Sequence, residues 1–453
     1  MCMMQGAVPK LNEFVGLLKL NSTRHALAVR LIVAFLMHRG RMSASQAAGS
    51  IRTEPRHRAQ LGRFLGRKFW GSVEILSTLR DAVLILSAPK GTYLFVVDQT
   101  YCSQQGTKTQ NTFRMGKESS RKNRKKRKSG YVLARKQCHC FVMGLLITPQ
   151  GVRIPFFKSY YTKDYCKENG LPYRRQTELA ADLIRELPSS VGADVIVLGD
   201  TAFDAESIHA VCEQCRYRWI VPMNTERVVA GPKPRPKVWS LASEFSADQF
   251  KPVRLHPGTG EFAAQRRASR YRVGPKAKCR TFYVHQERRE VQSVGRVRLV
   301  FSTKTSPQKG QAVDVQKILM TNDQTLAVAK IVELYDLRWQ IELIFKELKS
   351  NLGFHRYRFR RFGAVEQWVE FALAAFLYLE WYRASELRRR NLTRQQRRWW
   401  QQQRTYGPCH AIRQLTECNE IELLAKQLRT PRGVRKIQEI LQNACQKEFH
   451  MRN

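Results

Sequence analysis

Three acidic residues occupy positions from which a protein could do chemistry on phosphate esters. Asp98 follows an apolar run at residues 93–97, Asp200 follows a second run at 195–199, and Glu342 lies in a later helical stretch. Ligand sites in α/β proteins form at the carboxyl ends of sheet strands, where both aspartates are expected. Mg²⁺ takes oxygen ligands from a few carboxylates, from water and from substrate phosphate. We therefore predict that these residues bind two Mg²⁺ ions, which Mn²⁺ could replace, and catalyse phosphodiester chemistry.

The third acidic residue belongs to one long helix predicted over residues 327–350. At about 100° per residue, four side chains fall within roughly 60° of one face: Tyr335, Arg338, Glu342 and Lys349. A separate apolar stripe is expected to pack on a sheet: Leu337, Ile341, Ile344 and Leu348. Glu347 lies about 160° away from Glu342, so Glu342 is the predicted ligand. The alternative is a surface helix whose charges form i,i+4 pairs.

The elements that must position these residues alternate between strands and helices. Strand-like runs lie at residues 92–97, 140–148, 152–157, 194–199 and 218–221, with helices at 176–187 and 205–215 between them. This alternation predicts a mixed α/β sheet. Asp204, just before the second helix, is interpreted as its N-cap rather than as a metal ligand. A β-rich insertion begins after the Pro-rich stretch 231–236, and a strand at 317–321 returns to the core.

Five regions follow from this pattern. We predict a helical DNA-binding region at 1–88, a catalytic core at 89–228 and 317–385, a β-rich insertion at 229–316, and a basic helical region at 386–453 that could carry a dimer contact. The apolar run 368–382 contains Glu370 and Glu380 and is shorter than the roughly 20 residues that span a bilayer. It is therefore predicted to be a buried helix, and no membrane partner is expected.

The charge balance indicates a polyanionic partner. The 453 residues include 79 Lys and Arg against 37 Asp and Glu, a formal net charge of +42. Because basic residues occur in every region, nucleic acid fits better than a membrane surface. The residues expected to contact DNA are a basic loop, Arg121, Lys122, Arg124, Lys125, Lys126, Arg127 and Lys128, and two arginines of a helix-turn-helix-like segment, Arg63 and Arg67. The alternatives are a solvated loop, a generic helical bundle and a basic ribosomal-type protein.

The eleven cysteines are scattered and odd in number, which favours reduced thiols in a cytoplasmic protein. Cys138, His139 and Cys140 could be combined with Cys212 and Cys215 into a zinc site. That evidence is weak, because cysteine is commonly a small buried apolar residue.

The order and spacing of these motifs resemble a known family. Tyr335-x2-Arg338-x3-Glu342-x6-Lys349 matches the Y-(2)-R-(3)-E-(6)-K signature of DDE transposases of bacterial insertion sequences, in the IS-four group. Asp-Gln-Thr at 98–100 and Gly-Asp-Thr-Ala-Phe at 199–203 resemble the two earlier acidic motifs of that group. The resemblance covers about residues 90–380. It implies an RNase H-like core, a mixed sheet with flanking helices, interrupted by a β-rich insertion.

The resemblance also implies an activity: cut-and-paste transposition by end nicking, a hairpin intermediate and strand transfer. The partners would be the inverted repeats of double-stranded transposon ends, target DNA, and a second copy in a synaptic homodimer, in the bacterial cytoplasm and at the nucleoid when bound. Arg338 and Lys349 would grip phosphates and Tyr335 would hydrogen-bond one. Trp239 or Trp339 could receive a flipped base, although each could also be a plain core tryptophan.

Two other functions remain open at the level of sequence. An RNase H-like nuclease that never joins strands would need the same carboxylates. A non-catalytic DNA-binding protein derived from a transposase would be expected to have lost an acidic residue or part of the Tyr-Arg-Glu-Lys motif. All of these residues are present, which argues against the second alternative.

Overall fold

The computed structural model describes most of the chain. The described residues are 8–37, 63–66, 70, 74–86, 90–104, 109–115, 136–192, 194–224, 226–231, 235–255, 279–357, 359–389, 391–397, 412–414, 429–431 and 434–435. The predicted helix-turn-helix segment lies almost entirely outside them, as does the basic loop at 121–128.

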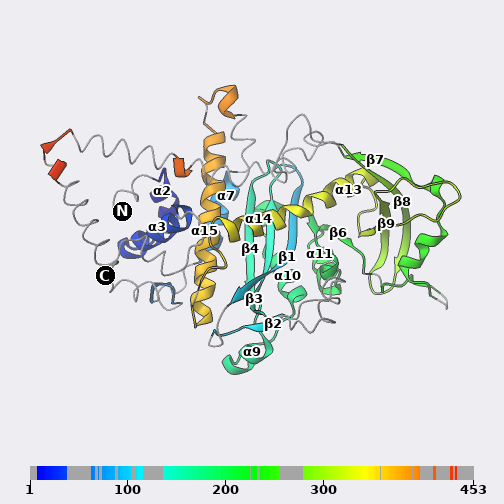
Figure 1. The fold of residues 1–453 in the computed structure, drawn as a ribbon, viewed down its shortest axis with the longest axis horizontal. Coiled ribbons are helices and arrows are strands. Elements are labelled where there is room, and N and C mark those ends of the chain that lie inside the picture. Colours follow the sequence, from blue (N-terminus) through cyan, green and yellow to red (C-terminus); the bar gives the residue numbers. More distant parts are fainter. Residues whose placement is uncertain are drawn as a thin grey trace, which may run out of the picture.

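A mixed sheet forms the centre of the protein (Figure 1). Five of its strands lie in the spatial order β4-β3-β1-β5-β6. β1 pairs antiparallel with β3, which pairs antiparallel with β4, whereas β5 is parallel to β1 and β6 is parallel to β5. This arrangement confirms the predicted RNase H-like fold. The bounds are β1 Tyr93–Gln104, β2 Phe113–Met115 (paired with β3), β3 Lys136–Ile147, β4 Arg153–Ser159, β5 Val195–Leu198 and β6 Arg218–Pro222.

The strands of the predicted insertion continue this same sheet. β10 pairs antiparallel with β6 on one side and with β9 on the other, so the order runs on as β6-β10-β9-β8-β7. The outermost strand carries Pro252 and the exposed residues Lys251 and Arg254, features that discourage pairing with another sheet edge. The bounds are β7 Lys251–Leu255, β8 Arg280–Val291, β9 Gly295–Thr303 and β10 Lys317–Thr321, with short 3₁₀ turns η3 Val238–Glu244 and η4 Ala247–Gln249.

Helices flank the sheet. α10 packs against β1, β3 and β4, and α11 packs against α10 and β6. The helix predicted over 327–350 is instead two α-helices joined by a 3₁₀ turn, which contains Arg338. The junction residues keep right-handed helical dihedrals, so the two helices follow one another end to end across the sheet (Figure 1). The bounds are α9 Lys163–Asn169, α10 Gln176–Arg185, η1 Ser189–Val191, η2 Thr201–Phe203, α11 Glu206–Gln214, α13 Val328–Asp336, η5 Leu337–Trp339 and α14 Gln340–Ser350.

A long apolar helix, α15 Phe362–Leu387, stands between the sheet and the N-terminal helices α2 Leu11–Gly16 and α3 Ser22–Met37 (Figure 1). A third N-terminal helix, α7 Ile75–Ile85, packs against both α15 and β4. By length and composition it is the one described helix that could cross a membrane, but 78% of its most apolar window is buried inside the protein. Its carboxylate Glu380 is buried and accepts hydrogen bonds from Arg153 (2.6 Å) and Arg383 (2.9 Å). The predicted buried helix is confirmed.

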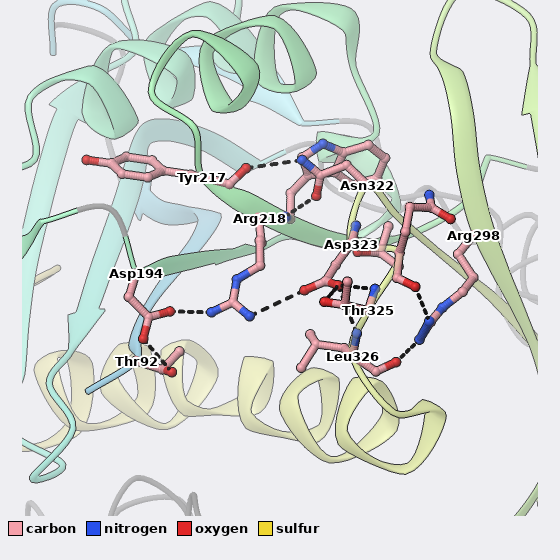
Figure 2. A network of polar contacts seen from close by, with 12 residues as sticks. Thr92, Asp194, Tyr217, Arg218, Arg298, Asn322, Asp323, Thr325 and Leu326 are labelled. Atoms are coloured by element: carbon pink, nitrogen blue, oxygen red, sulfur yellow. Dashed lines mark hydrogen bonds and ion pairs between the residues drawn. The ribbon is translucent and has the colours of Figure 1, made fainter.

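A network of polar contacts fixes the loop that leads into α13 (Figure 2). The buried carboxylate of Asp323 accepts hydrogen bonds from the backbone N–H groups of Thr325 (2.7 Å) and Leu326 (2.9 Å). Arg218, the first residue of β6, reaches both Asp323 (3.3 Å) and the half-exposed Asp194. Burial opposes ionisation of Asp323, but these hydrogen bonds and Arg218 outweigh it and lower its pKa. The network therefore sets where α13 begins and how its face meets the sheet.

We expect Asp323→Ala to lower the free energy of unfolding by about 1–2 kcal/mol, because it leaves the partly buried N–H groups of Thr325 and Leu326 without their acceptor. The lowered folded pKa means that the ionised form stabilises the protein above the ordinary Asp pKa of about 3.9, and that this contribution is lost as the pH falls through the folded value. Urea unfolding near pH 7 measures the effect. Asp194→Ala, which removes the other partner of Arg218 at a half-exposed site, should change stability by less than about 1 kcal/mol.

Candidate active site

The first two acidic residues lie side by side. The parallel pairing of β1 and β5 ends at Val96 opposite Leu198, so Asp98 and Asp200 each stand two residues further along their neighbouring chains. The apolar run predicted that Asp98 ends its strand, and this is wrong. β1 continues to Gln104, pairing over this last part with β3 alone. Burial, together with the negative charge of Asp200, raises the pKa of Asp98 to about 6.

Asp200 is held in a tight turn. Its carboxylate accepts a hydrogen bond from the N–H of Ala202 (2.9 Å) and caps the 3₁₀ turn η2. Gly199 before it packs closely, since a Cβ at that position would lie 3.0 Å from the Cβ of Phe203. A larger residue at 199 would force this turn to shift.

Asp204 plays a different part from the predicted one. The N-cap of α11 is Ala205, and the buried Asp204 carboxylate instead accepts hydrogen bonds from Asn224 N (2.8 Å) and Arg227 Nη2 (2.8 Å). His209 lies beside it, with its Nε2 3.4 Å from the carboxylate, and burial lowers the pKa of His209 to about 4. Asp204 thus ties the turn after Asp200 to the segment that follows β6. Sequence spacing missed this role, because Asn224 and Arg227 lie some twenty residues away.

The guanidinium of Arg338 lies between the carboxylates of Glu342 and Asp98. Arg338 places Nη2 2.7 Å from Glu342 Oε1 and Nη1 3.6 Å from Asp98 Oδ2. The Glu342 side chain is 32% exposed, whereas Glu347 is 1% exposed and is buried on the other side of the helix. The predicted apolar stripe is also confirmed, because all four of its members are buried: Leu337, Ile341, Ile344 and Leu348.

The other two members of the helix motif flank this bridge. Burial raises the pKa of Tyr335 to about 12, opposed by the positive charge of Arg338, so the hydroxyl stays protonated. Lys349 donates a hydrogen bond from Nζ to the carbonyl of Tyr101 in β1 (3.0 Å). This contact holds the C-terminal end of α14 against the strand that carries Asp98.

The remaining predicted residues fall into two groups. Trp339 is 53% exposed and Trp239 40% exposed, so neither is a core tryptophan, and Arg63 is exposed. Eight predicted DNA contacts lie outside the described residues: Arg67, Arg121, Lys122, Arg124, Lys125, Lys126, Arg127 and Lys128.

The carboxylates of Asp98, Asp200 and Glu342 suit a hard cation, but they do not converge on one coordination site. Within the described part of the chain, no three His, Cys, Asp or Glu side chains are grouped closely enough to hold a metal ion. Asp98 nevertheless lies within electrostatic range of both Asp200 and Glu342, since both carboxylates raise its pKa. The guanidinium of Arg338 shows that this cluster accepts positive charge. Carboxylate oxygens are also the ligands that Mg²⁺ prefers, so the residues fit such an ion in kind.

The alternative zinc site is not assembled. Successive residues of a strand point to opposite faces, so His139 points away from Cys138 and Cys140. Its ring nitrogens contact the Tyr357 hydroxyl (2.9 Å) and the Gln110 carbonyl (2.9 Å). Cys138, Cys140 and Cys212 are buried, and Cys215 is partly buried.

Comparison with known families agrees with this geometry. A family model described as "DDE superfamily endonuclease" matches residues 13–244, more than half of the chain, and includes Asp98 and Asp200. A model described as "Transposase DDE domain" matches residues 174–378 and includes Asp200 and Glu342. No curated protein matches this chain.

Proposed function

This chain belongs to the DDE superfamily of transposases and endonucleases, and from that premise we propose that it is a cut-and-paste DNA transposase with Asp98, Asp200 and Glu342 as its catalytic carboxylates. The observation that carries the proposal is the shared cation. Arg338 lies between Asp98 and Glu342, and Asp200 stands beside Asp98 two residues beyond the end of the neighbouring strand β5. Two of the three acidic residues thus share one guanidinium, and the third lies beside Asp98.

Two Mg²⁺ ions, or Mn²⁺ in their place, would supply activation of a water and charge stabilisation at the attacking and leaving oxygens of an in-line displacement. Asp98, Asp200 and Glu342 would hold them. Glu342 pairs with Arg338, so its carboxylate would turn away from the guanidinium to act beside the two aspartates.

A phosphate of bound DNA would compete with Glu342 for the guanidinium of Arg338. The guanidinium can donate two parallel hydrogen bonds to phosphate oxygens. It donates one to Glu342. Arg338 would then stabilise charge on the substrate while Glu342 becomes free. Lys349 holds the helix against β1 through its hydrogen bond to the main chain of Tyr101, and the other N–H groups of its ammonium would grip a phosphate. Tyr335, protonated at neutral pH, can donate a hydrogen bond to a neighbouring phosphate.

The finer steps of the proposal rest on the resemblance of the helix motif to the IS-four group. They are nicking at inverted-repeat ends, a hairpin intermediate and joining to target DNA by a synaptic homodimer. The exposure of Trp339, next to Arg338, supports the flipped-base role, because a base can stack only on a ring that is accessible. Trp239 is exposed as well and serves as the second candidate.

The rival function is a DNA endonuclease that does not join strands, which the description of the longer family match also covers. The deciding experiment gives the purified chain and Mg²⁺ two substrates: duplexes bearing the inverted repeats that flank the gene, intact or already cleaved to expose a 3′-OH. We expect cleavage of the first and joining of the second to a target plasmid. Cleavage without joining would establish the nuclease. If neither reaction occurred, the chain would be a DNA-binding protein without catalysis.

A further inference from the structure

A lysine outside the recognised motif stands over the ring of Tyr335. Lys317, the first residue of β10, is exposed and places Nζ 4.8 Å from the centre of that ring. A cation within about 6 Å of an aromatic face is attracted by the ring's electron density. The contact fixes the ammonium beside the helix turn that carries Arg338.

The same ammonium lies near two other cations, of which only Arg338 is paired with carboxylates. Burial lowers the pKa of Lys317, and the charges of Arg338 and Lys304 lower it further, which shows that both cations are near. Lys304 lies just beyond the end of β9, and Lys317 pairs in register with Ser302, two residues earlier in that strand. No carboxylate among the described residues lies within 4 Å of either lysine's ammonium.

These residues form a row that leads to the carboxylates. Lys304 and Lys317 stand at one end of the β9–β10 ladder, Tyr335 lies under Lys317, and Arg338 follows on the way to Asp98 and Glu342. Arg338 is paired with Asp98 and Glu342, but the two lysines have no carboxylate partner among the described residues, so their charges are favourable beside an anion that extends past Arg338. We propose that Lys317, supported by Lys304, binds a backbone phosphate of the DNA strand next to the one at the catalytic carboxylates. This inference rests on the proposed function for the identity of its ligand.

A structural alternative is that Lys317 serves only to pack on Tyr335. Lys317→Met separates the two roles, because methionine keeps an apolar stem over the ring and removes the charge. Lys317→Arg keeps the charge and a cation–π contact. Lys251→Met on the edge strand β7, three strands away from β10, is the matched control for loss of one exposed lysine.

The test is binding of the full-length chain to a fluorescent duplex in EDTA over a series of salt concentrations. For Lys317→Met we expect a several-fold weaker affinity at low salt and a slope of log affinity against log salt smaller by about 0.9, the value for one lost phosphate contact on duplex DNA. Lys317→Arg should restore the slope, and Lys251→Met should leave it unchanged.

An unchanged salt slope for Lys317→Met would overturn the inference. If the melting temperature of that variant also fell, Lys317 would serve only to pack on Tyr335. Because the assay contains no divalent cation, it is independent of catalysis. A reduced slope in a chain that fails to cleave DNA would support the phosphate contact and count against the proposed transposase. Normal cleavage with an unchanged slope would count against Lys317 only.

Discussion

Glu342→Gln should abolish Mg²⁺-dependent cleavage of transposon-end DNA, with a loss of roughly a thousandfold or more, about 4 kcal/mol of transition-state stabilisation. Glutamine keeps the size and one oxygen of the side chain but removes the negative charge. The helix should keep its place, because Leu337, Ile341 and Leu348 remain buried. DNA affinity should stay the same or rise slightly, since an acidic group near the phosphates is lost.

The measurement is single-turnover cleavage at saturating DNA, with binding followed separately by fluorescence anisotropy. Asp336→Asn is a suitable control, because Asp336 is the last residue of the preceding helix α13 and pairs with Arg280 rather than with Arg338. That variant should cleave at close to the parental rate. Full activity in Glu342→Gln would remove Glu342 from the catalytic set.

Arg338→Met should have two opposite effects. In the absence of DNA the affinity for Mn²⁺ should rise by about tenfold, because a positive charge that sits 2.7 Å from Glu342 and 3.6 Å from Asp98 no longer competes with the ion. Cleavage of DNA should fall by about a hundredfold, because the fork that would take two phosphate oxygens is gone. A change in DNA affinity alone would reflect a general loss of basic charge. Stronger Mn²⁺ binding together with slower cleavage would identify the contact of Arg338 with Asp98 and Glu342.

Titration of free Mn²⁺ by electron paramagnetic resonance measures the first effect, and single-turnover cleavage measures the second. Arg338→Lys keeps the charge and loses the fork, so it should bind Mn²⁺ as weakly as the parent and still cleave slowly. An unchanged Mn²⁺ affinity in Arg338→Met would mean that the guanidinium does not compete with a cation for these carboxylates.

Much of the site could be predicted because its positions follow from short-range patterns. Apolar runs that are buried on both faces locate Asp98 and Asp200, and helical spacing separates Glu342 from Glu347. The extent of β1 could not be predicted in this way. Residues 99–104 are mostly polar and pair with β3 only, so no apolar run marks them.

Other features depend on contacts between distant parts of the chain. The insertion strands lack helical periodicity, but nothing local shows that β9 will pair with β10 and extend the core sheet. Asp204 precedes a helix like an N-cap, and only the folded chain brings Asn224 and Arg227 to it. Lys317 is one lysine among many until β10 places it over Tyr335.

The central claim is that Asp98, Asp200 and Glu342 act on a shared cation. Anomalous diffraction from crystals of the chain bound to cleaved transposon-end DNA and Mn²⁺ tests it most directly. The account predicts metal density in contact with all three carboxylates, with Arg338 turned from Glu342 to a phosphate. Metal density that omits Glu342, while Arg338 still pairs with it in the presence of DNA, would contradict the account.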